Sequence, residues 1–116
     1  MSKGRETVDY LDDIRGAIAE VEEFTRGMSY DAFITDRKTI NAVIRSLEVL
    51  GEASKHIPSA FRQKHPDVPW SKMAGMRDVL IHDYMGVDLI TVWKVVLERL
   101  PEIKPRIEKL WEEKVT

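Results

Sequence analysis

The chain of 116 residues has room for one domain with a buried core, and its 43% hydrophobic and 33% charged residues are globular values. It has no cysteine, which excludes disulfides and thiolate metal sites, and no apolar run approaches the roughly 18 residues of a membrane span. The net charge of −2 argues weakly against a polyanionic partner, and with no signal segment at its start we expect a cytoplasmic protein.

Charge is unevenly distributed along the chain. Between Gly51 and Arg77 five bases stand against two acids, whereas between Met1 and Gly27 seven acids outnumber four bases. A solvated charged face would explain either stretch taken alone. The basic stretch nevertheless leads directly into a segment where an anion would have to bind.

The first quarter of the sequence predicts one long helix and a helical turn. Apolar side chains recur at three- and four-residue steps from about Thr7 to Arg26, which is the pattern of an amphipathic helix. Gly27 is the expected stop. The polar segment 28–35 predicts a single helical turn.

The middle of the chain predicts a second long helix and a short one. Asp36 is a candidate N-cap, because its carboxylate can accept from the free amides of the next turn, and the helix is expected to end near His56. Pro58 suits a first turn, so a short helix is expected at 59–64. Two prolines make the segment 65–70 a stiff loop.

The last third predicts two further helices. Ser71 is expected to cap the first of them and Gly86 to end it, while Asp88 is a candidate cap for the next. Pro101 and Pro105 are expected to break or bend that helix before a terminal one. Because no segment alternates with a period of two, the sequence predicts an all-α bundle of four or five helices with short connections.

The segment 76–84 carries the residues best suited to chemistry. Arg77 stays charged and offers five donors for phosphate oxygens, and His82 can take or give a proton near neutrality. Such a pair could cleave RNA through its own 2′-hydroxyl, with His82 as base, Arg77 stabilising the phosphorane and Asp78 orienting the imidazole or a partner group. Since RNA supplies the nucleophile, no metal or cofactor is needed and DNA would be inert.

Helical spacing constrains this pair. Arg77 and Tyr84 are two turns apart and share a stripe, but His82 is five residues from Arg77, about 140° around a regular helix. Either the helix distorts near Gly86, or a symmetric dimer brings the Arg of one chain to the His of its mate. The spacing favours the dimer.

Non-catalytic interpretations of these residues compete with the ribonuclease interpretation. A lone Arg and a lone His on a helix are more often surface or capping residues than catalysts, and His56 and His65 are expected to be structural. No histidine spacing resembles a metal-ligand pattern. Other functional classes are a non-catalytic module that binds a nucleotide or a partner in the same cleft, and a plain interaction protein. The three tryptophans are expected to serve core or dimer packing: Trp70, Trp93 and Trp111.

Several stretches together resemble the HepT-like toxins of the HEPN superfamily. The motif is Arg77, four residues, His82, one residue and Tyr84, with Asp78 at the polar position after the arginine. The neighbouring stretches that match are Phe24–Ser29, Asp36–Thr39, Leu50–Ala53, Pro69-Trp70, Met73–Asp78 and Tyr84–Asp88. The resemblance covers nearly the whole chain and implies a single domain of this kind over residues 1–116.

The resemblance also implies an activity and a partner. It implies a homodimeric, metal-independent ribonuclease that acts as the toxin of a type VII-like toxin–antitoxin system, with catalytic roles falling on Arg77 and His82 and a supporting one on Asp78. The antitoxin would be a minimal nucleotidyltransferase that transfers AMP to Tyr84, placing a bulky anionic group in the cleft. Candidate contacts to the RNA substrate are Lys72, Arg37 and Lys38; no membrane or DNA partner is expected.

Overall fold

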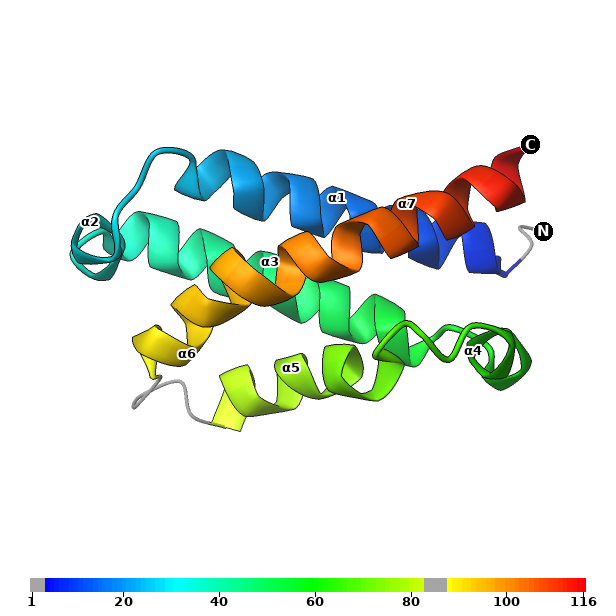
Figure 1. The fold of residues 1–116 in the computed structure, drawn as a ribbon. Helices are drawn as coiled ribbons and strands as arrows, with labels where there is room; N and C mark the ends of the chain where they lie inside the picture. Colours follow the sequence, from blue (N-terminus) through cyan, green and yellow to red (C-terminus); the bar gives the residue numbers. More distant parts are fainter. Residues whose placement is uncertain (1–3, 83–87) are drawn as a thin grey trace.

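Helices make up most of the chain that the structure, a computed structural model, describes: residues 4–82 and 88–116, with side chains described throughout except at 77–82. None of these residues lies in a strand, which confirms the all-α prediction. The elements are α1 (Thr7–Thr25), α2 (Tyr30–Ile34), α3 (Arg37–Lys55), α4 (Ser59–Lys64), α5 (Trp70–His82), α6 (Leu89–Lys94), the π-helical segment η2 (Val95–Arg99) and α7 (Leu100–Val115) (Figure 1).

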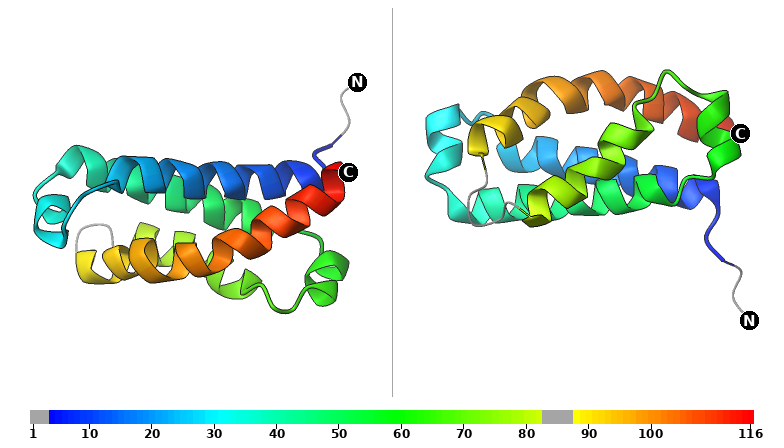
Figure 2. Two further views of the ribbon diagram at one scale, coloured as in Figure 1. Left: turned by 45° about the horizontal axis from the view of Figure 1, so that its top comes forward. Right: turned by 90° about the horizontal axis from the view of Figure 1, so that it is seen from below.

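The long helices pack as antiparallel neighbours. α3 lies between α1 and α5, and α7 packs against α1 (Figure 1). The short helices mark the ends of the bundle: α2 lies at one end, and α4 lies at the other, near the C-terminus (Figure 2). Because α3 and α5 run in opposite directions, the start of α3 and the end of α5 lie at the same end of the bundle. No helix in the described part of the chain is both long and apolar enough to cross a membrane.

One hydrophobic cluster fills the space between these helices, and the predicted stripes supply it. α1 contributes Leu11, Ile14, Ile18 and Val21, each at most 2% exposed, as the three- and four-residue spacing predicted. Further members come from the other long helices and from the short α2 and α6: Phe33, Val43, Leu47, Leu50, Met73, Trp93, Leu100, Ile103 and Ile107.

The predicted caps of α1, α3 and α6 are confirmed. Gly27 follows α1 with φ of 76°, a conformation that favours glycine. Asp36 accepts from the amide of Thr39 at 3.0 Å, and this bond lowers the pKa of the carboxyl. At the start of α6 the Asp88 carboxylate accepts from the amide of Ile90. A second hydrogen bond, from the Thr91 hydroxyl, is the largest cause of the lowered pKa of Asp88.

The predicted cap of α5 is wrong. The helix begins at Trp70, and the amide of Met73 donates to the carbonyl of Pro69, so Ser71 lies inside the first turn. Gly86, the expected stop of α5, lies outside the described residues.

The prolines near the C-terminus do not break the helix. α6, η2 and α7 follow one another without a gap, and the amide of Leu100 donates to the carbonyl of Val95, one residue further back than in an α-helix. This register shift places Pro101 in the first turn of α7, where its missing N–H is tolerated. Pro105 lies inside α7 but is exposed, so water can satisfy the carbonyl that loses its partner.

Candidate functional site

α5 carries three of the four motif residues. Arg77 and Asp78 lie in its second half and His82 is its last residue, while Tyr84 lies outside the described residues. Although the side chains at 77–82 are not described, the backbone fixes how the positions are arranged. The structure therefore brings Arg77, Asp78 and His82 onto a single helix, as the sequence predicted.

The continuity of α5 decides how the two candidate catalytic positions relate. α5 is an uninterrupted α-helix from Trp70 to His82, so no distortion falls between positions 77 and 82. Those positions are then about 140° apart around the axis. A bend near Gly86 would lie beyond both and would not bring them together.

The first half of α5 is firmly anchored. Met73 is fully buried, and the helix packs along α3. Trp70 is 5% exposed, and its indole N–H donates to the carbonyl of His65 at 3.0 Å, which ties the start of α5 to the preceding loop. Arg106 of α7 donates to the carbonyl of Asp67 in the same loop. These contacts fix the direction of the α5 axis, and with it the location of positions 77, 78 and 82.

The three candidate RNA contacts do not lie together. Lys72 is exposed on the first turn of α5, at the end of the bundle that α4 occupies. Arg37 and Lys38 are exposed at the start of α3, which lies at the other end, where α5 finishes (Figure 1). The motif positions on α5 thus lie between two separate groups of cations.

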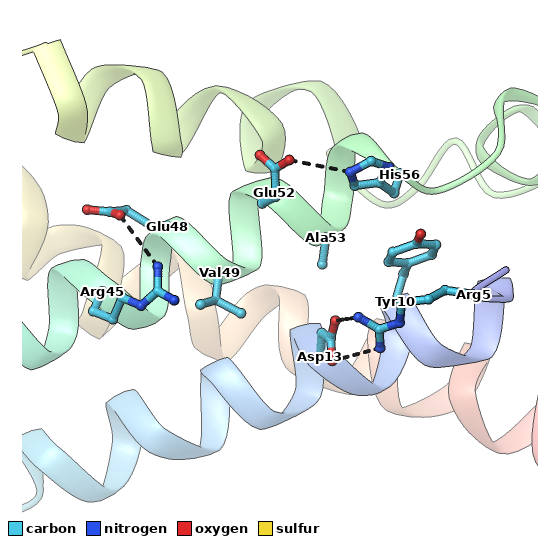
Figure 3. Close-up of a pocket in the computed structure, with 9 residues that line it drawn as sticks. All are labelled: Arg5, Tyr10, Asp13, Arg45, Glu48, Val49, Glu52, Ala53 and His56. Carbon is cyan, nitrogen blue, oxygen red and sulfur yellow. Dashed lines mark hydrogen bonds and ion pairs between the residues drawn. The ribbon is translucent and has the colours of Figure 1, made fainter. Parts of the chain in front are cut away.

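A hollow of about 430 Å³ between α1 and α3 was not predicted from the sequence (Figure 3). The Tyr10 ring stacks on His56 with centroids 5.1 Å apart, and the Arg5 guanidinium lies 5.0 Å from the centroid of the same ring. Arg5 also bonds Asp13 at 2.7 Å, which raises the pKa of the guanidinium, and His56 contacts Glu52 at 3.3 Å. Since these groups satisfy one another, the hollow supports the structural role predicted for His56.

The other aromatic predictions can also be checked. Trp70 and Trp93, at 5% and 9% exposure, belong to the core, as expected. Trp111 is partly buried, and the Arg15 guanidinium covers its ring at 3.6 Å from the centroid. His65 ends α4 and lies 4.6 Å from the Phe61 ring centroid. None of these rings is a free platform for a nucleobase.

Comparison with known proteins gives one consistent result. Residues 14–110 match the family described as "Ribonuclease HepT-like". A protein of Thermococcus cleftensis named "Probable ribonuclease HepT" is 54% identical over 102 residues, covering 88% of this chain and 93% of the relative. A candidate RNase of Methanocaldococcus jannaschii is 46% identical, covering 93% and 98%, and one of Caldanaerobacter subterraneus is 40% identical, covering 87% and 90%. No solved structure matches the chain significantly.

Proposed function

This chain belongs to the family of HepT-like ribonucleases, and from that premise we propose that it cleaves RNA without a metal ion, through the 2′-hydroxyl of the RNA itself. Its relatives are named as ribonucleases, the enzymes that cleave RNA. The observation that supports the mechanism is the placement of Arg77 and His82 on one anchored helix, inside the matched region. We propose that residues 1–116 act as a single domain of this kind, in the cytoplasm.

The proposed reaction is an internal transesterification. His82 takes the proton of the 2′-hydroxyl as O2′ attacks the adjacent phosphorus. Arg77 stabilises the charge that develops on the non-bridging oxygens, and Asp78 orients the reacting groups. The bond from phosphorus to O5′ breaks and O5′ takes a proton from solvent, so the products are a 2′,3′-cyclic phosphate and a 5′-hydroxyl.

We propose that the working form is a homodimer. The positions of Arg77 and His82 diverge by about 140° within one α5, so a single chain does not bring both to one phosphate. A two-fold axis beside α5 would set the Arg77 of one protomer against the His82 of its partner. Ile90 and Leu97, which are 53% and 56% exposed, are available apolar contacts for a dimer.

The reaction is tested by incubating the purified protein with single-stranded RNA of mixed sequence in excess EDTA. We expect cleavage to continue at an undiminished rate and to leave 2′,3′-cyclic phosphate ends, because no step requires a metal ion. The same sequence made as DNA should remain intact, since it lacks the nucleophile. Loss of cleavage on chelation, or 5′-phosphate products, would contradict the mechanism.

We further propose that the protein is the toxin of a toxin–antitoxin pair and that a nucleotidyltransferase antitoxin adenylylates Tyr84. An AMP group on that phenol would occupy the site and repel an RNA phosphate. Coexpression with a small nucleotidyltransferase encoded beside it should increase the mass of the protein by one or more AMP groups and suppress cleavage. Tyr84→Phe should gain no mass and stay active; an unchanged mass in the parent protein would refute the assignment.

A further inference from the structure

Two hollows adjoin each other along the first half of α5. One, of about 530 Å³, lies between α4 and the start of α5 and is lined by Arg62 and Lys72. The other, of about 220 Å³, lies between α5 and the η2–α7 segment and is lined by Lys72, Arg99 and Arg106. Pro66, Pro69 and Lys72 line both hollows, so the two are neighbours, and together they are here called the basic groove.

The basic groove collects cations from four separate elements: α4, α5, η2 and α7. The acids that line it are Asp67 and Glu102, both in the second hollow, and the first hollow has none. Among the residues that the structure describes, Arg62, Lys72 and Arg99 form no ion pair. With four cations against two acids, the groove keeps a net positive charge, which favours an anionic ligand.

Two of the arginines show how the groove is held. The Nε atom of Arg62 is buried by the packing around it and has no hydrogen-bond partner among the residues that the structure describes. Arg106 donates to the carbonyl of Asp67, so its guanidinium is fixed against the loop between α4 and α5. The groove therefore combines packed arginines with two exposed cations, Lys72 and Arg99.

The groove borders the turn of α5 that precedes the proposed catalytic residues. Met76 lines its second hollow and immediately precedes Arg77 in the chain. Lys72 is five residues before Arg77 on the same uninterrupted helix, about 7.5 Å along the axis and about 140° around it, so a strand that contacts both has to pass around α5. An RNA strand bound at residues 77–82 would therefore enter the groove within a few phosphates of the cleaved bond.

We propose that the basic groove binds the phosphate backbone of single-stranded RNA on one side of the cleaved bond. The proposal rests on the ribonuclease function, and it names where the flanking strand lies. A strand with regularly spaced phosphates suits cations spread over four elements better than a compact anion does. Backbone contacts of this kind add affinity and set the register without reading sequence.

The test uses 2′-O-methyl RNA, which keeps the phosphates but has no free 2′-hydroxyl, so binding is measured without cleavage. The Lys72→Gln/Arg99→Gln double variant should bind this strand roughly 2- to 30-fold more weakly at low salt, as expected for two lost solvent-exposed ion pairs. The slope of log affinity against log salt should become shallower by about 1.4, or about 0.7 per lost phosphate contact. Fluorescence anisotropy over a salt series gives both values.

Arg45→Gln is the control for charge removal outside the groove, and it removes one cation where the double variant removes two. It also removes one exposed arginine, but from the hollow between α1 and α3, and its side chain is 76% exposed. It should leave affinity and salt slope as in the parent protein. Equal binding by the double variant and this control, with both folded by circular dichroism, would overturn the groove assignment.

Cleavage of short substrates separates this proposal from the ribonuclease function. The defect of the double variant relative to the parent protein should grow with substrate length, and should be smaller for a dinucleotide than for a longer RNA that reaches the groove. Lengthening the RNA on one side should raise kcat/KM for the parent protein only. If the parent protein cuts no RNA, the function itself fails; if lengthening helps both proteins equally, only the groove fails.

Discussion

Replacing His82 with alanine should lower the rate constant for RNA cleavage by about 10²–10⁴-fold, the usual contribution of a general base. Arg77→Ala should lower it by about 10²–10³-fold, as expected when one group that stabilises the developing charge is lost. The rate constants are measured in single turnover with enzyme in excess, so that product release does not mask the chemical step. Binding of 2′-O-methyl RNA should change much less for His82→Ala than the rate does.

The chain offers a matched control for the histidine. His56 lies at the end of α3, exposed and stacked on Tyr10, and it has no part in the proposed reaction. His56→Gln should therefore cleave RNA at nearly the parent rate. If His82→Ala also retained the parent rate, the assignment of the base would be wrong even though the family is established.

Mixing the two inactive variants tests the two-fold arrangement. In a dimer formed from one Arg77→Ala chain and one His82→Ala chain, one of the two shared sites keeps both groups and the other lacks both. Random exchange of equal amounts makes half of the dimers mixed, so activity should recover to about a quarter of the parent value. If each chain used only its own residues, mixing would restore nothing.

The sequence predicted best the structural features that depend on residues close together in the chain. Asp36 and Asp88 were recognised as caps because the amides they accept from lie two or three residues away. The short helix at 59–64 was predicted with the bounds that the structure gives to α4, since proline restricts the chain before it. Apolar spacing likewise placed most of the core face of α1, although Phe24, the last apolar residue of that stripe, is 37% exposed.

What the sequence missed depends on register and on distant packing. Pro101 was expected to break or bend a helix, because nothing local shows that the hydrogen-bond register shifts at Val95–Arg99 and gives the proline a first-turn position. The basic groove was missed for a different reason. Arg99 and Arg106 are far from Lys72 in the sequence, and only the packing of the α6–α7 segment beside α5 brings them together.

Met73 shows how strongly the site depends on the core beneath it. Its side chain is fully buried on α5, one turn before Arg77, in the core cluster through which α5 packs against α3. Met73→Ala should lower the free energy of unfolding by about 2–5 kcal/mol, because it removes buried surface and leaves a cavity. Met73→Leu conserves the volume and should cost less than about 1.5 kcal/mol.

Urea unfolding followed by circular dichroism measures both values, at one protein concentration because dimerisation would make stability depend on concentration. Where both variants remain folded, Met73→Ala should also cleave RNA more slowly than Met73→Leu, since a looser α5 positions the Arg77 segment less well. Equal unfolding free energies for the two variants would mean that α5 does not rest on Met73. In that case the anchoring of the catalytic helix would have to come from Trp70 and its bond to His65 instead.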